Sequence, residues 1–111
     1  MKLMIKELEK RFAEVGYQDG KGYDALVIGK FFHPASSWRW FATEYEPRPK
    51  IFFGYVTGFE NEFGYFSLAE LESIKGPFGL GVERDRYFKE QPLKEALKAV
   101  GKAIEYEKSL E

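Results

Sequence analysis

Four short apolar runs between Ala25 and Phe66 are separated by connections that are too short to hold a crossover helix. Parallel strands require such a helix, whereas a tight turn can join antiparallel strands. The runs are rich in the aromatic and β-branched residues that favour strands, and they occupy residues 25–32, 38–45, 50–57 and 63–66. The sequence therefore predicts an antiparallel meander, to which residues 82–88 add a fifth strand at an edge.

Apolar residues recur at helical spacing on both sides of this sheet, over residues 2–15 and again over residues 92–108. Ser67 stands three residues before Glu70, which is the spacing of a capping box and predicts that a short helix begins there. The Gly76-Pro77 pair should prevent that helix from continuing. We therefore expect an α+β fold, in which an antiparallel sheet of four or five strands is packed by N- and C-terminal helices plus one short helix.

Strict alternation along residues 38–45 would divide their side chains between the two faces of the sheet. One face would receive Trp38, Trp40, Ala42 and Glu44, and the other would receive Arg39, Phe41, Thr43 and Tyr45. In a stable monomer one face should pack under the helices and the other should be partly open. Gly54 and Gly58, within and beside the next strand, should allow a bulge or the close packing of an aromatic ring.

Length and composition indicate one domain over residues 1–111. The chain has 44% hydrophobic residues and no cysteine, so its stability should come from packing and not from disulfides. Its 17 Lys and Arg nearly balance 18 Asp and Glu, so a field strong enough to hold duplex DNA is not expected. No run approaches the roughly 20 apolar residues of a membrane span, and charges interrupt the region where a signal peptide would be apolar. We expect a cytoplasmic protein with no membrane partner.

Several motifs occur together in the aromatic part of the chain, namely FFHPASSWRWFATE, FFGYVTG, EFGYFSL and GPFGLGVERD. In this order they resemble the bacterial family of unknown function DUF2958, and the resemblance covers roughly residues 3–95. It implies a small bacterial protein of a kind often carried on plasmids and integrated elements, with no established activity or catalytic residue to transfer. Family members tend to carry a longer acidic insertion where this chain has only the turn at residues 46–49.

Few residues of the chain are candidates for catalysis. His33 is the only histidine and precedes Pro34. It is either a turn residue at the end of a strand or a general acid or base. The charged cluster at residues 83–86 has two possible roles. In one, Arg84 or Arg86 binds an anionic group while Glu83 or Asp85 binds a metal or acts as a base. In the other, the charges protect an edge strand from pairing with another strand. The three Asp residues form no DxD pair, so a two-metal site is not expected. The glycine-rich loop GPFGLG lacks the Gly-Lys-Ser/Thr ending of a Walker motif, so a phosphate-binding loop is not expected either. We therefore predict no cofactor, no metal and no catalytic residue.

Aromatic and arginine side chains remain as a predicted binding surface. Such residues anchor protein interfaces, and aromatic rings also stack on single-stranded nucleic acid. The predicted surface consists of Trp38, Arg39, Trp40, Tyr45, Arg48, Tyr55, Arg84 and Arg86. The first hypothesis is a non-catalytic accessory or interaction protein of a mobile element, with an unknown protein partner. The alternatives are a single-stranded nucleic-acid-binding protein, and a small hydrolase or nuclease that uses Glu83, Arg84, Asp85 and His33.

Overall fold

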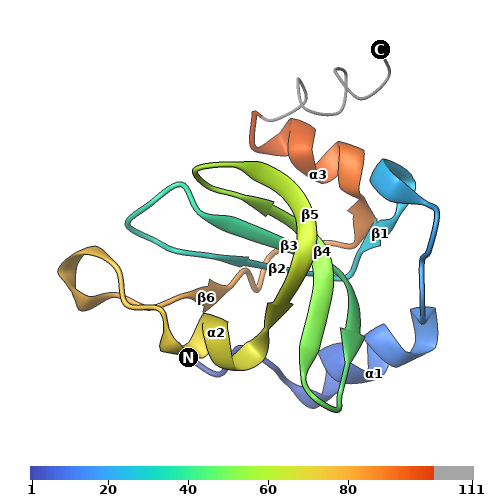
Figure 1. Cartoon of the computed structure of the whole chain (residues 1–111), viewed down its shortest axis with the longest axis horizontal. Coiled ribbons are helices and arrows are strands. Elements are labelled where there is room, and N and C mark those ends of the chain that lie inside the picture. The colour runs from blue at the N-terminus through green and yellow to red at the C-terminus, as the bar shows by residue number, and fades with distance from the viewer. Residues whose placement is uncertain (102–111) are drawn as a thin grey trace.

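The computed structural model describes residues 1–101 of the chain. Its helices and 3-10 turns are α1 (Lys6–Val15), η1 (Gly22–Asp24), α2 (Leu68–Ser73), η2 (Pro77–Gly79) and α3 (Leu93–Ala99). Its strands are β1 (Leu26–Val27), β2 (Gly29–Phe32), β3 (Arg39–Glu46), β4 (Ile51–Thr57), β5 (Asn61–Ser67), β6 (Glu83–Arg84) and β7 (Gln91–Pro92). Figure 1 shows a strongly twisted sheet, with α3 above it and α1 below it in this view.

The main sheet has five antiparallel strands in the order β5-β4-β3-β2-β6. Strands β2 to β5 form a meander, and the chain then returns past α2 to place β6 on the free side of β2. The predicted α+β fold and antiparallel sheet are confirmed. The predicted edge strand over residues 82–88 is much shorter than expected. It ends after Arg84 because the Asp85 carboxylate accepts a hydrogen bond from the Tyr87 amide and turns the chain.

The predicted first strand, residues 25–32, is two strands that lie in different sheets. β2 joins the main sheet, whereas β1 pairs with β7 just before α3. The Leu93 amide donates to the carbonyl of Ala25 at 2.8 Å, so this small ribbon holds the start of α3 in place. A continuous apolar run does not reveal its pairing partners, which is why one strand was expected. The predicted helix over residues 92–108 begins as expected, and its second half lies outside the described residues.

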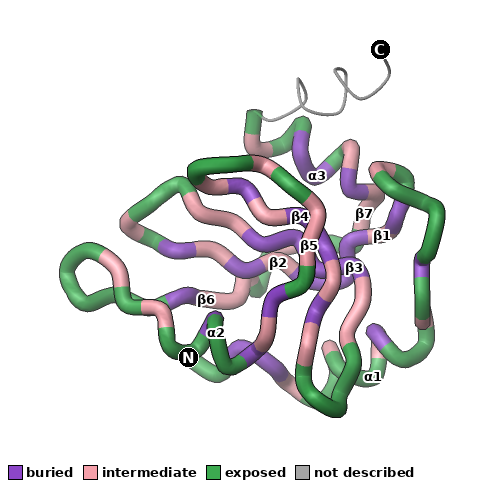
Figure 2. The backbone as a smooth tube through the Cα atoms, in the orientation of Figure 1, coloured by how far each residue is buried: buried purple, intermediate pink, exposed green. Residues whose placement is uncertain are grey.

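The two faces of the main sheet bury separate apolar clusters. On the first face, α1 and α2 pack over side chains that include Phe31 and Trp40. On the second face, α3 and β1 pack over Phe41 and Tyr55. Burial is concentrated in β2, β3 and β4, whereas β5 is mostly half-buried or exposed (Figure 2). The second face stays open toward β5, where the side chain of Tyr65 is 78% exposed.

A bulge in β3 interrupts the predicted alternation. Ala42 lies opposite Gly54, but Glu44 and not Thr43 lies opposite Phe53. β3 therefore contains one residue more than β4 over this step, which is the definition of a β-bulge. The extra residue shifts every following side chain of β3 to the other face of the sheet.

This shift corrects the faces predicted for two side chains. Tyr45, expected on the face of Phe41, packs instead on the first face, with ring centroids 5.8 Å from Phe12 and 4.7 Å from Phe52. Glu44, expected on the face of the tryptophans, lies on the second face. The bulge thus delivers a carboxylate to the part of the sheet that the helices leave open.

The short helix after β5 begins as predicted. Its cap is Ser67, whose hydroxyl accepts a hydrogen bond from the Glu70 amide at 3.0 Å. The helix ends at Ser73, before the Gly76-Pro77 pair. None of the helices within residues 1–101 has the length and apolar character needed to cross a bilayer.

Candidate functional site

The structure distributes the predicted binding surface over several environments. Trp40 and Tyr55 are only 5% and 2% exposed, and they belong to the cores on opposite faces of the sheet. The others are half-buried or exposed at scattered positions: Trp38, Arg39 and Tyr45 on β3 or just before it, Arg48 in the β3–β4 turn, and Arg84 and Arg86 in or after β6. The described residues therefore do not present these eight side chains as one surface.

Trp38 lies where the β2–β3 and β4–β5 hairpins meet. Its ring stacks on that of Trp40 at 5.8 Å and meets the edge of Phe59 at 5.6 Å. Gly58 makes this packing possible, because a Cβ there would lie 2.5 Å from the indole of Trp38. The prediction that this glycine permits the close packing of a ring is confirmed. The described residues that line a cavity of about 320 Å³ beside Trp38 include no Asp, Glu, Lys or Arg.

His33 connects β2 to the segment after α2. Its ring is buried, and the Ala35 amide donates to Nδ1 at 3.2 Å. Nε2 therefore carries the proton and donates to the carbonyl of Leu80 at 2.8 Å. Gly76 allows the ring to lie this close, because a Cβ there would be 2.2 Å from Nε2. Both ring nitrogens are occupied by backbone groups, so the contacts of His33 are structural.

The charged cluster around β6 is also tied into the fold. Arg84 donates to two backbone carbonyl oxygens at the start of the chain, at 2.5 and 3.3 Å. The Asp85 carboxylate lies 3.5 Å from Lys30 Nζ. Glu83 is half-buried and Arg86 is exposed. Within residues 1–101, no group of three or more His, Asp or Glu side chains is arranged to hold a metal ion.

The open part of the second face contains a different candidate site. Two cavities of about 440 and 300 Å³ share one set of walls, formed by Asp19, Glu44, Phe53 and Tyr65. We call this surface the acidic-aromatic groove, and it is completed by Tyr17, Glu46 and Phe63. Cavities of this size suit small ligands or single side chains of a partner.

The sheet holds the rings of the groove in place. Phe53 and Tyr65 are paired across β4 and β5, with their rings 4.9 Å apart in an edge-to-face arrangement. Phe63, two residues before Tyr65, stacks beside Phe53 at 6.2 Å. Because the strands fix these positions, a partner that binds the rings does not have to order them first.

The carboxylates of the groove form no ion pair among the described residues, although Glu44 and Glu46 also line a neighbouring cavity with Lys6 and Lys10. Among the described residues that line the groove, none is Lys or Arg. Within residues 1–101, the ion pairs all involve other acidic residues, so Asp19, Glu44 and Glu46 are not neutralised by such contacts. The Tyr17 hydroxyl donates to the Glu46 carboxylate. This bond, the charge of Glu46 and the nearby charges of Glu44 and Asp19 raise the pKa of Tyr17 above its ordinary value. The described lining of the groove therefore has an excess of acidic over basic side chains.

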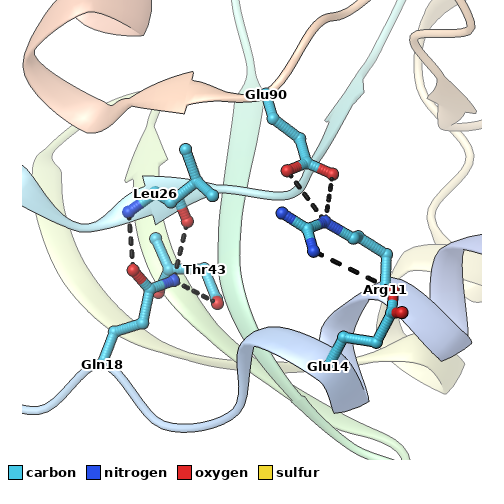
Figure 3. Close-up of polar contacts among 6 residues, drawn as sticks. All are labelled: Arg11, Glu14, Gln18, Leu26, Thr43 and Glu90. Carbon is cyan, nitrogen blue, oxygen red and sulfur yellow. Dashed lines mark hydrogen bonds and ion pairs between the residues drawn. The ribbon is translucent and has the colours of Figure 1, made fainter.

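A buried glutamine positions one wall of the groove (Figure 3). The Gln18 amide nitrogen donates to the carbonyl oxygens of Leu26 and Thr43, at 2.8 Å each, and its oxygen accepts from the Leu26 amide at 2.7 Å. The backbone amide of Gln18 donates to the Glu44 carboxylate at 2.9 Å. The loop after α1 is thereby fixed to β1 and to the bulge, and the Glu44 carboxylate is oriented beside it.

The groove was missed at the level of sequence because strict alternation hides a bulge. Gly54 was the available signal, since a Cβ there would lie 1.9 Å from the carbonyl oxygen of Phe41. Only glycine allows β4 to approach β3 so closely, and the prediction that it permits a bulge is confirmed. Gln18 gave no comparable signal, because a single polar residue in a loop has no periodicity.

The comparisons with known proteins identify a family whose function is unknown. The model of a family described as "Protein of unknown function (DUF2958)" matches residues 3–103, and this range includes all of α3. No curated protein and no solved structure matches the chain.

Proposed function

Because the chain belongs to the DUF2958 family of unknown function, we propose a function from its own geometry: it is a non-catalytic interaction module that binds a cationic segment of a partner protein in the acidic-aromatic groove. The observation that carries this proposal is the combination of exposed aromatic rings with carboxylates that have no Lys or Arg among the described lining residues. The proposal keeps the interaction module expected from the sequence and replaces its aromatic and arginine surface with an aromatic and acidic one.

Rings and carboxylates recognise a cation in complementary ways. A guanidinium or ammonium group over the face of a tyrosine gains about 0.5–1 kcal/mol at an exposed site. Tyr65, which is 78% exposed, offers such a face. The carboxylates of Asp19, Glu44 and Glu46 add an attraction that salt screens over a Debye length of about 8 Å. Such a site favours a moderate, salt-sensitive affinity and prefers Arg, whose planar group can also stack.

The geometry does not favour the two alternatives considered from sequence. Single-stranded nucleic acid requires aromatic platforms within a positively charged groove, whereas the open rings here lie beside carboxylates that would repel phosphate. A hydrolase or nuclease would need His33, Glu83, Arg84 and Asp85 to act together. Of these, His33, Arg84 and Asp85 make separate structural contacts with the backbone or with Lys30.

The proposal is tested with a fluorescein-labelled nine-residue peptide in which Arg and Thr alternate. The control peptide replaces each Arg by citrulline, which preserves shape and removes charge. Fluorescence anisotropy should show binding of the arginine peptide that weakens at least tenfold with citrulline and weakens on raising the salt concentration. Equal affinity for the two peptides would overturn the proposal, as would the absence of binding by the arginine peptide at low salt.

Protein variants locate the contact. Glu44→Gln keeps an oxygen that accepts from the Gln18 amide, and Tyr65→Ala changes an exposed ring, so both variants should remain folded. Each should weaken the arginine peptide at least fivefold. The matched controls are Tyr87→Ala, which changes another largely exposed tyrosine outside the groove, and Glu60→Gln in the β4–β5 turn. If the controls weaken binding as much as the groove variants do, the peptide binds elsewhere and the assignment of the site is wrong.

A further inference from the structure

The outer edge of β5 is a second unusual feature beside the groove. β5 pairs with β4 in unbroken register from Asn61 to Ser67 and is the terminal strand on its side of the main sheet. Within residues 1–101, no further strand pairs with it. The opposite edge strand, β6, is only two residues long. The described sheet therefore has one long edge, and it borders the groove.

This edge lacks the devices that protect free strands. Natural edges are interrupted by proline, lysine, bulges or inward-pointing charges, because a row of unpaired amide and carbonyl groups invites another strand. The sequence of β5, NEFGYFS, contains no proline or lysine, and its register shows no bulge. Its one charged residue, Glu62, is exposed. Such an edge is a ready template for strand addition.

Resting on the proposed function, we infer that the cationic partner segment binds as an extended strand along the free edge of β5, with its basic side chains at every second position and directed over the groove. The added strand would lie about 4.8 Å from β5. Alternate side chains of such a strand fall on the face that carries Phe63 and Tyr65. A basic side chain there lies over the Tyr65 ring and points toward the carboxylates beyond it.

Charge complementarity favours this occupant over a second copy of the chain. Two copies joined edge to edge through β5 would continue one sheet, so their two grooves would lie on the same face, next to each other. In that arrangement β3 and its copy, which carry the two Glu44 residues, would be five inter-strand spacings or about 24 Å apart, and neither groove would gain a Lys or Arg in its described lining. A second copy would therefore leave the carboxylates of both grooves without a cation, whereas a strand with alternate basic residues brings the opposite charge to the same surface.

Backbone methylation of the peptide tests the strand geometry. In an added strand, only every second residue directs its amide and carbonyl toward β5, and the other residues direct theirs to solvent. Two isomers of the arginine–threonine peptide are therefore compared, one N-methylated at two odd positions and the other at two even positions. One isomer should bind at least tenfold more weakly than the unmethylated peptide, and the other should stay within threefold of it. Which isomer is blocked reports whether the added strand is parallel or antiparallel to β5.

Amide hydrogen exchange gives an independent measurement on the protein. Binding of the unmethylated peptide should slow exchange at alternate amides of β5 by at least tenfold and leave the amides of β6 unchanged. The strand geometry would be overturned if both methylated isomers lost binding, or if neither isomer did. If neither isomer lost binding, the protein would still bind the arginine peptide more tightly than the citrulline peptide, so the proposed function would stand while this inference fails. A dimer that forms through β5 and is not dissociated by the peptide would also overturn it.

Discussion

Replacing Gln18 tests how the groove is held together. Its side chain is 4% exposed and makes hydrogen bonds with the Leu26 amide, the Leu26 carbonyl and the Thr43 carbonyl. Each such bond contributes about 0.5–1.5 kcal/mol net, so Gln18→Ala, which removes all three, should lower the free energy of unfolding by about 2–4 kcal/mol. With an m-value of about 1–3 kcal/mol/M, the urea midpoint should fall by about 0.7 M or more.

Gln18→Glu separates hydrogen bonding from side-chain volume. The carboxylate has nearly the same size as the amide, but it faces two carbonyl oxygens to which it cannot donate. Gln18→Glu should therefore be at least as destabilising as Gln18→Ala at neutral pH, although it removes no packing. Asp19→Asn, at the exposed neighbouring position, is the control and should stay within about 0.5 kcal/mol of the parent chain. The argument is refuted if Gln18→Ala costs less than about 1 kcal/mol, or if Gln18→Glu is the milder change.

Three further measurements address the helix cap, the groove and the bulge. Ser67→Ala should cost about 1 kcal/mol in chemical denaturation, and no measurable change would contradict the cap. In a titration of ring-labelled tyrosine by NMR, Tyr17 should lose its proton above the ordinary tyrosine pKa, because Glu46 stabilises the protonated form. Glu46→Gln should lower the pKa of Tyr17, and an unchanged value would contradict that contact. Gly54→Ala should prevent stable folding because its Cβ would lie 1.9 Å from a backbone oxygen of β3, whereas at its cross-strand partner Gly64→Ala should change stability little, since a Cβ there meets nothing within 4 Å. Equal effects of the two glycine changes would contradict the close approach at the bulge.

The sheet was predictable because its signals are local. Short apolar runs, tight connections and the Ser67 cap each depend on a few neighbouring residues, and the structure has the expected meander and short helix. The β1–β7 ribbon was not predictable in the same way. β1 and β7 are only two residues each and are far apart in the sequence. Nothing in the apolar run at residues 25–32 distinguishes a strand that pairs with β7 from one that continues into the main sheet.

The residues of the predicted binding surface lie in different environments for a reason that also concerns register. Alternation assigns faces correctly only as far as Ala42, because the bulge that follows exchanges the positions of Glu44 and Tyr45. Tyr45 then packs against Phe12 in the core of the first face. Burial of Trp40 and Tyr55 follows from the presence of helices on both faces, whereas the expectation of one partly open face holds only for the part of the second face near β5.

Net charge concealed the polarity of the groove, because a total does not record which charges are paired. The chain has a formal net charge of −1, yet several of its cations have internal partners. Arg11 donates to the Glu90 carboxylate at 2.8 Å (Figure 3), Lys30 lies 3.5 Å from Asp85, and Arg84 donates to backbone carbonyls. None of these contacts involves a residue that lines the groove, whose carboxylates have no ion pair within residues 1–101. A nearly neutral chain can therefore gather carboxylates without ion pairs along one groove, so its net charge predicts neither the sign nor the place of a local excess of charge.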